Sequence, residues 1–380
     1  MVVAQFLNWI DTARVSERAS AASALARAYL RDDLDFEDRC GAEAALTMLL
    51  DDPSPKVRLA MAEVLSLSYR APQQIISALA ADQPEIAAAV LALSPVLADG
   101  DLIDRIATGD GTTQRHIASR PVVSMQVSAA IAEVGEAEAV IELVNNPGAT
   151  IAALSFRRIA ERLGRSGPVR EALMGDGRLP CDARHHLLVQ VGQALKDAPF
   201  VVALIGAARA EKLTRDACVK ASITLIDGTN TSEYAALVEH LRMRGELTTG
   251  FLLRTAALGK IDFFGAALVT VSGQSSQRVR ALLSGGRDAA LAALFRASGL
   301  PAYADAAILT ALTVWREVAN GKRLAGAQEV TWLMLKAINA APGQTGPTPE
   351  RRELASLLKS IHLDELRANA RGHALAIAAA

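Results

Sequence analysis

The best-spaced pair of metal-ligand residues in this sequence is Cys181 and His185. They lie four positions apart after Pro180, which places both side chains on one face of a predicted helix. Two such ligands can contact zinc, but a structural zinc site needs four, and no second pair with diagnostic spacing accompanies them. The remaining cysteines, Cys40 and Cys218, are too scattered for a disulfide framework. We therefore interpret the pair as a partly buried cysteine and a helix-surface histidine, and we expect no metal or other cofactor.

The motifs of covalent catalysis and phosphate binding are not found. The sequence has no Gly-x-Ser-x-Gly elbow and no cysteine in a recognisable histidine context. Gly285-Gly286-Arg287 precedes a predicted helix and could hold an anion there, but it lacks the P-loop and dinucleotide fingerprints. The acidic run at residues 32–38 lacks EF-hand spacing. We expect no catalytic residues, and the alternative is an enzyme whose residues assemble only in space.

Arginine and histidine side chains are the best candidates for binding a partner. One predicted helix carries arginines at i, i+4 and i+7, and a second segment combines two arginines with a histidine. Such groups bind carboxylates or phosphates, although a basic helix face is commonly only solvated and a histidine can simply pack between helices. The candidate partner-binding residues are Arg115, His116, Arg120, Arg158, Arg162 and Arg165.

The elements that would position these residues recur about every 30 positions. Residues 52–58 open a helix with Ser54 as a predicted N-cap and Pro55 at the first helical position. A related opening at residues 82–86 has capping-box spacing, and weaker copies follow at residues 110–115 and 146–151. Pairs of short helices repeating at this period are typical of an α-solenoid.

Apolar periodicity and the prolines that end helices predict a chain of short helices. In the first part we expect them at Val15–Arg31, Glu37–Leu50, Pro55–Ser68, Pro72–Ala81, Pro84–Leu93, Asp101–Thr108, Thr113–Ser119, Ser124–Val134, Ala137–Asn145 and Thr150–Leu163. Beyond Gly164 we expect Pro180–Lys196, Ser232–Arg244, Thr248–Leu258, Ser276–Leu283, Asp288–Ala297, Ala302–Ala319 and Ala325–Ala340. Ala267–Val271 is the nearest approach to a strand, with helix as its alternative.

These patterns predict an all-α protein in which an α-solenoid of helical hairpins is followed by a second all-helical domain. We expect the repeat domain at residues 1–166, the second domain at 167–341, a linker at 342–348 and a docking helix at 349–380. The last helix carries an apolar stripe that is costly to expose. The stripe consists of Leu354, Leu357, Leu358 and Ile361.

Short motifs within residues 82–164 carry a family resemblance. They are Glu85-Ile86-Ala87, Ser94-Pro95-Val96-Leu97, Asp101-Leu102-Ile103, His116-Ile117-Ala118-Ser119-Arg120-Pro121 and Leu143-Val144-Asn145-Asn146. With them the segment resembles an uncharacterised alphaproteobacterial helical family, a domain of unknown function with HEAT-like repeats. Residues 52–58 are similar to the helix-opening segment of HEAT repeats. The resemblance implies the fold and transfers no activity.

Composition limits the classes of function. The 380 residues are 51% apolar and carry a net charge of −1, which does not fit a disordered chain or a strongly basic nucleic-acid binder. The charge is uneven, because residues 1–150 hold 11 Lys/Arg and 21 Asp/Glu, whereas the remainder carries a formal charge of +9. The longest uncharged apolar stretches are shorter than a membrane span, so we expect no membrane span and a cytoplasmic protein.

We therefore expect a non-enzymatic adaptor or regulatory protein that binds another protein through its helical-repeat surface. The uneven charge makes self-association a further expectation. The alternative is a HEAT-like protein that binds or modifies nucleic acid. It is less favoured, because only 4% of the residues are aromatic and few of those lie among the arginines.

Overall fold

The computed structural model describes residues 9, 12–31, 34–340 and 348–379. The protein is all-α, as the sequence predicts, and within the described residues the only β pairing is an isolated bridge between Val123 and Ala149. The segment considered as a strand lies inside a helix, α18 (Ile261–Ser272). The chain divides into two compact units, unit 1 (Met1–Gln190) and unit 2 (Val191–Ala380).

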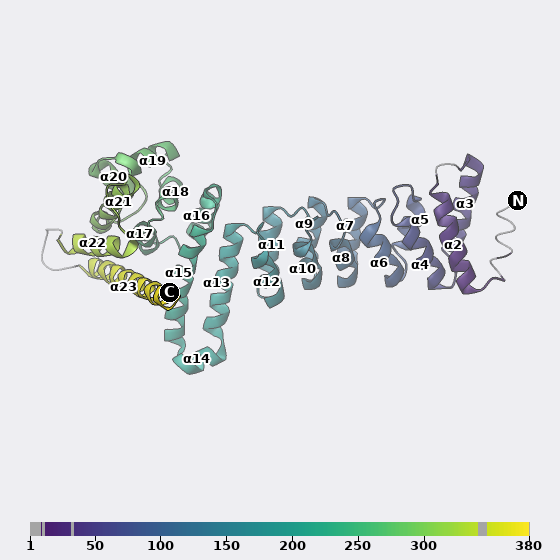
Figure 1. The fold of residues 1–380 in the computed structure, drawn as a ribbon, viewed down its shortest axis with the longest axis horizontal. Helices are drawn as coiled ribbons and strands as arrows, with labels where there is room; N and C mark the ends of the chain where they lie inside the picture. Colours follow the sequence, from purple (N-terminus) through teal and green to yellow (C-terminus); the bar gives the residue numbers. More distant parts are fainter. Residues whose placement is uncertain (1–8, 10–11, 32–33, 341–347, 380) are drawn as a thin grey trace. The chain divides into compact units, whose positions relative to one another are not determined.

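Unit 1 is a succession of short helices (Figure 1). Many of them pack against the helix two places further along the chain. Helices α2, α4, α6, α8, α10 and α12 contact one another in that order, and α7, α9 and α11 do the same. The helices are α2 (Val15–Tyr29), α3 (Phe36–Leu49), α4 (Pro55–Leu65), α5 (Gln73–Leu79), α6 (Pro84–Leu93), α7 (Asp99–Thr108), α8 (Gly111–Ala118), α9 (Met125–Val134), α10 (Ala137–Asn145), α11 (Ala153–Leu163), α12 (Gly167–Gly175) and α13 (Cys181–Asp197), the last of which continues into unit 2.

Side-chain caps and prolines start the helices of unit 1. Asp110 accepts a hydrogen bond from the Thr113 backbone at the start of α8 (2.8 Å). Pro55 occupies the first turn of α4, as predicted. The predicted cap Ser54 makes no such side-chain bond; instead Asp52 accepts from the Ser54 backbone N–H (2.8 Å). A carboxylate two residues earlier therefore fixes the turn before α4.

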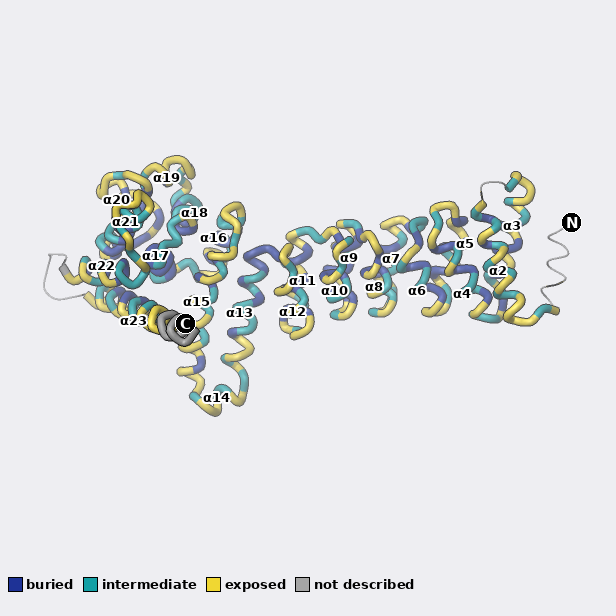
Figure 2. The backbone as a smooth tube through the Cα atoms, in the orientation of Figure 1, coloured by how far each residue is buried: buried dark blue, intermediate teal, exposed yellow. Residues whose placement is uncertain are grey.

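The core of unit 1 is continuous from α2 to the beginning of α13 (Figure 2). In α12, Val169 and Leu173 are fully buried in it, and Leu187 of α13 closes its end. Packing of α12 against α10 and α11 makes it one more member of the series. For this reason unit 1 extends to Gln190, past the expected boundary at residues 166/167, which rested on a glycine-rich segment that in fact includes a helix.

Unit 2 is built around aromatic side chains. Phe263, Phe264 and Phe295 are fully buried, and Phe264 and Phe295 meet edge to face with ring centroids 6.3 Å apart. Trp315 donates its indole N–H to the carbonyl of Ala256 (2.8 Å). The remaining helices are α14 (Pro199–Ile205), α15 (Ala207–Asp227), α16 (Tyr234–Met243), α17 (Thr249–Ala257), α19 (Ser276–Gly285), α20 (Asp288–Ala297), α21 (Asp305–Ala319), α22 (Ala327–Ala340) and α23 (Pro349–Ala379).

Helix α23 packs against α22 and α17 with the apolar stripe that the sequence indicates. Leu354, Leu358 and Ile361 are buried, and Leu357 lies so close to Gly250 of α17 that a Cβ there would be 3.2 Å from its methyl carbon. The predicted linker lies outside the described residues except for its last position. Among the described helices, none is by itself long and apolar enough to cross a membrane; α13 and α14 meet that test only as a pair bent by 61°.

Candidate interaction surface

Side chains from one helical hairpin cap the helix ends of the preceding hairpin. Arg120 donates to the carbonyl groups of Leu91 and Ser94 at the end of α6, both at 2.6 Å. Asn146 donates to two carbonyl groups at the end of α8 (2.7 and 2.8 Å), and Arg178 donates to two at and after the end of α10 (2.8 Å each). The last carbonyl groups of a helix lack intrahelical partners and carry a partial negative charge, so these donors stabilise them. The ends of α6, α8 and α10 therefore share one edge of unit 1, which we call the C-terminal edge.

Helix ends are capped in the same way at the opposite edge of unit 1, where the odd-numbered helices α5 and α9 end. Arg105 donates to two carbonyl groups at the end of α5 (2.7 and 3.1 Å). Arg162 donates to two carbonyl groups at and after the end of α9 (2.6 and 3.1 Å). Both edges are thus held by side-chain donors, arginines and one asparagine, that contact backbone carbonyl oxygens.

Two of the six candidate partner-binding residues, Arg120 and Arg162, are therefore engaged inside unit 1. Burial lowers the pKa of each guanidinium, but the arginine remains charged at any physiological pH. His116 is half-buried, and burial together with the neighbouring Arg115 cation lowers its pKa, which favours the neutral imidazole. The charge available to a partner is smaller than the sequence indicates.

The other three candidates are exposed. Arg158 pairs with Glu133 (2.9 Å), and Arg115 lies 3.9 Å from Glu138. Arg165 follows the end of α11 and is exposed. Arg115 and Arg120 lie near the C-terminal end of α8, at the C-terminal edge, whereas Arg162 caps α9 at the opposite edge. The two groups therefore do not form a single basic site.

Two segments at the C-terminal edge, residues 119–126 and 146–154, are joined backbone to backbone. Each consists of the connection between two helices and the first two residues of the helix that follows. Val123 donates its N–H to the carbonyl of Gly148 (3.2 Å) and accepts from the N–H of Thr150 (3.0 Å). The approach is close enough to require glycine, since a Cβ at position 148 would lie 1.9 Å from the backbone oxygen of the facing connection. The pair forms a fixed platform rather than two independent loops.

This platform exposes large apolar side chains and no charge. Val122 and Leu154 are 74% and 73% exposed, and Met125 is 51% exposed. The one charged residue in the two connections is Arg120, which is buried. Met125 and Leu154 lie in the first turns of the contacting helices α9 and α11. We call Val122, Met125 and Leu154 the apolar edge.

Neighbouring connections also expose apolar side chains, although the first of them exposes the charged Arg70 as well. Tyr69, in the connection after α4, and Leu93, at the end of α6, are also exposed. At the opposite edge, the connections next to α8 and α10 instead expose the carboxylates of Asp110 and Glu136, together with Val134. The two edges therefore differ in the chemistry that they present to a partner.

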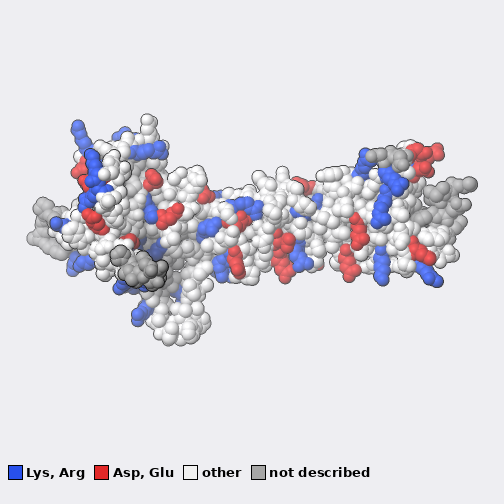
Figure 3. Space-filling model, in the orientation of Figure 1, with Lys and Arg blue, Asp and Glu red and all other residues white. Residues whose placement is uncertain are grey.

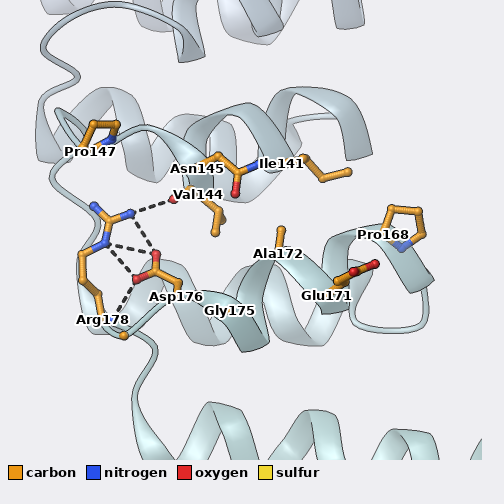
Figure 4. Close-up of a pocket in the computed structure, with 11 residues that line it drawn as sticks. Ile141, Val144, Asn145, Pro147, Pro168, Glu171, Ala172, Gly175, Asp176 and Arg178 are labelled. Atoms are coloured by element: carbon orange, nitrogen blue, oxygen red, sulfur yellow. Dashed lines mark hydrogen bonds and ion pairs between the residues drawn. The ribbon is translucent and has the colours of Figure 1, made fainter.

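A groove of about 780 Å³ lies between α10 and α12 (Figure 4). Its apolar lining consists of Ile141, Val144, Pro147, Pro168 and Ala172. At one end Arg178 pairs with Asp176 (2.8 Å), and Glu171 lies toward the other end. Pro147 belongs both to the groove and to the platform, so the groove adjoins the apolar edge.

The described parts of the chain contain no cluster of metal-ligand side chains. Nowhere in them do three His, Cys, Asp or Glu side chains lie close enough to hold a metal ion. Cys181 and His185 are both buried at the start of α13, so the interpretation of His185 as a helix-surface residue is wrong. A second pocket, of about 470 Å³, lies between α22 and α23, where Asn369 donates to Gln328 (2.8 Å).

No pattern in the sequence singles out Arg178, Asn146 or the apolar edge. The one signal is that residues 146–154 contain no charged side chain. The platform can be recognised only when the two connections are seen to pair.

The fold defines an all-helical protein in which hairpins with capped ends support an exposed apolar platform. The chain belongs to the DUF2336 family, described as uncharacterised protein conserved in bacteria, whose family model matches residues 86–340. The resemblance to an uncharacterised helical family is thereby confirmed. No curated protein and no solved structure matches the chain. The matched region contains the apolar edge and the groove, and the family description assigns no activity to them.

Proposed function

We propose that the protein is a non-enzymatic adaptor or regulatory protein of the cytoplasm, whose unit 1 acts as a HEAT-like solenoid that binds another protein. The observation that carries the proposal is the apolar edge. Three large side chains more than half exposed, on a platform without exposed charge, are costly to leave in water. A partner that covers them gains this free energy.

The surroundings of the apolar edge suit a protein partner. Protein interfaces have an apolar centre within a polar rim, and here the adjoining groove supplies both apolar walls and the Glu171 carboxylate. The platform is fixed by its backbone pairing, so binding costs little ordering of the platform itself. We expect the partner to offer a segment with several apolar side chains, such as one face of an amphipathic helix.

Nucleic acid binding has weaker support. Arg120 and Arg162 are occupied by backbone carbonyl groups, and the exposed Arg158 is paired with Glu133. Phosphate backbones are bound by accessible clusters of cations, which this arrangement does not concentrate on one face. Figure 3 shows acidic and basic side chains interspersed along unit 1 on the face that it draws.

The test places a photo-crosslinking amino acid at position 122 in the full chain, and at position 134 as the matched control on the opposite edge. We expect position 122 to capture a protein that position 134 does not. The captured protein, once purified, should lose at least about tenfold in affinity for a Val122→Asp, Leu154→Asp variant.

A Val134→Asp variant should bind the same protein as the native chain does. Circular dichroism of all variants checks the fold. Equal capture at both positions, or equal affinity of all variants, would contradict the proposal. Steeply salt-dependent binding to DNA would favour the nucleic-acid alternative.

A further inference from the structure

Helix α14 forms an exposed apolar tip in unit 2, between the end of α13 and the start of α15 (Figure 1). None of its seven residues is buried (Figure 2). Phe200 and Leu204 are 76% and 70% exposed, and their spacing of four places both side chains on one face of the helix. An exposed aromatic ring next to an exposed leucine is an unfavourable arrangement in water.

The two helices that carry the tip, α13 and α15, touch each other below it. The end of α13 and the middle of α15 approach so closely that a Cβ at Gly192 would lie 2.4 Å from the sulfur of Cys218. Ala210, in the first turn of α15, is buried. Gly206, with φ of +80°, makes the turn from α14 into α15, a conformation that favours glycine. The tip is therefore carried by two helices that touch at Gly192 and Cys218.

Charge is absent from the tip and reappears on both sides of it, before it in Lys196 and Asp197, which lie 3.9 Å apart, and behind it in α15. Residues 198–208 contain no charged side chain, and Figure 3 shows this part of the molecule as white. Arg209 and Lys212 follow in the first two turns of α15; both are exposed, and neither forms an ion pair with the described residues. The helical rise places Lys212 about 8 Å behind the start of α15. Arg215, one turn further, is paired with Glu211 (2.8 Å).

The size of the tip argues against a second copy of the chain as its occupant. A stable interface buries about 1,200–2,000 Å² in total, and a helix of seven residues is about 10 Å long. Two such tips cannot supply that area. A convex apolar tip with cations in the first two turns of the helix behind it instead matches a bilayer interface. There apolar side chains enter about 5–10 Å and Lys or Arg contact the lipid phosphates.

We propose that the α14 tip inserts into the surface of an anionic lipid bilayer. Phe200 and Leu204 enter the boundary between headgroups and acyl chains, while Arg209 and Lys212 contact anionic headgroups. The helix is far shorter than the thickness of the hydrocarbon core, so insertion is shallow and reversible. The proposal does not depend on the apolar edge of unit 1.

The first test is sedimentation of the full chain with vesicles. We expect binding to vesicles of phosphatidylcholine mixed with phosphatidylglycerol, and at least about tenfold weaker binding to phosphatidylcholine alone. A Phe200→Asp, Leu204→Asp variant should lose at least about tenfold in binding to the mixed vesicles. The matched control is Leu324→Asp, at an even more exposed leucine (98%) of the same unit, and it should bind as the native chain does.

The second test locates the inserted residue. In Phe200→Trp the new indole should be quenched by brominated lipid in the mixed vesicles, whereas the indole of Leu324→Trp should not. Native Trp fluorescence is subtracted with the unsubstituted chain.

The charge component is tested with Arg209→Glu, Lys212→Glu, which should remove the preference for anionic lipid. Equal binding of the tip variant and the native chain would overturn the proposal, as would equal quenching at positions 200 and 324. A tip variant that changes only the mass of the protein in solution would also overturn it and would assign the tip to self-association.

Discussion

The two units solve the problem of joining short helices in different ways. In unit 1, arginine and asparagine side chains reach from one hairpin to the carbonyl ends of the previous one, as Arg120 and Asn146 do. In unit 2, large aromatic rings from several helices meet in one core, with Phe263 and Phe264 fully buried. In unit 1 the helix contacts join neighbours along the chain. In unit 2 neighbouring helices also pack together, but α17 in addition contacts α21, α22 and α23, far along the chain.

This difference has a thermodynamic consequence. A series of hairpins that contact mainly their neighbours loses stability locally when one junction is broken. A single core loses stability as a whole when one of its large side chains is removed. The units also differ in charge, since unit 1 has 18 Lys/Arg against 25 Asp/Glu and unit 2 has 22 against 16.

The largest effect is expected for the core of unit 2. Replacing Phe263 with alanine removes a fully buried ring and leaves a cavity, which should lower the free energy of unfolding of unit 2 by about 3–5 kcal/mol. Denaturant unfolding combined with hydrogen exchange measures both the size of the effect and its extent. Exchange should increase throughout unit 2. Phe200→Ala, at an exposed ring, should change the stability by less than about 0.5 kcal/mol.

A smaller and more local effect is expected at a junction of unit 1. Arg120→Met keeps the apolar stem but leaves two carbonyl groups at the end of α6 without their donor, which should cost about 2–4 kcal/mol. Arg115→Met, at an exposed arginine five residues earlier in α8, should cost less than about 0.5 kcal/mol. Hydrogen exchange should increase mainly around α6 and α8. Exchange spread evenly over unit 1 would show that its hairpins unfold as one, and would contradict the expectation that a broken junction destabilises unit 1 only locally.

The sequence predicts the helices of unit 1 better than their junctions. Helix α6 begins and ends where proline and the apolar periodicity predict, at Pro84 and Leu93. The capping contacts could not be predicted, because the acceptors of Arg120 are backbone carbonyl groups 26 and 29 residues away. A backbone carbonyl has no sequence signature, so an arginine that caps a helix and one that binds a partner look the same in the sequence.

Around the α14 tip the sequence was less informative. Residues 198–208 are apolar without alternation, so they indicated neither a helix face nor a boundary, and helices α14 and α15 were not predicted. Glycines near Gly175 concealed α12 in the same way, because they were interpreted as a loose connection. The alternation of apolar and polar residues predicts a helix only where one face of the helix is buried and the other is exposed. Helix α14 has no buried residue, so this signal is missing.

Low pH should affect the stability of the two units differently. Burial would raise the pKa of Asp82, but hydrogen bonds from Arg58 (2.6 and 3.0 Å) and the charge of Arg58 outweigh it, so the pKa lies below its ordinary value. The ion pair then stabilises unit 1 above the unfolded pKa of about 4 and is lost as the pH falls through the lower folded value. In unit 2, burial raises the pKa of Asp305 despite Arg296, so its contribution is present at low pH and is lost as the pH rises.

Lowering the pH from neutral to about 4 and below should therefore destabilise unit 1 more than unit 2, by about 1 kcal/mol for the Arg58–Asp82 pair. Unfolding monitored by hydrogen exchange at each pH measures the two units separately. In Asp82→Asn, which cannot ionise, this part of the pH dependence of unit 1 should disappear. A parallel loss in both units would contradict the assignment.

The smallest expected effect concerns the exposed arginine of α11. Arg158 pairs with Glu133 across 2.9 Å, but both side chains are about half exposed, so Arg158→Gln should change the stability of unit 1 by less than about 0.5 kcal/mol. Arg162 is unsuited to the same test, because it holds the end of α9 and its replacement would disturb the fold.

Arg158→Gln can therefore reveal a role of this arginine in binding without a change in the fold. If α11 binds an acidic partner, or if the uneven charge drives self-association, this variant should weaken the binding or reduce the mass in light scattering, and the effect should fade as salt rises. An unchanged partner affinity and an unchanged mass would mean that Arg158 is a solvated side chain, and recognition by unit 1 would then rest on its apolar edge.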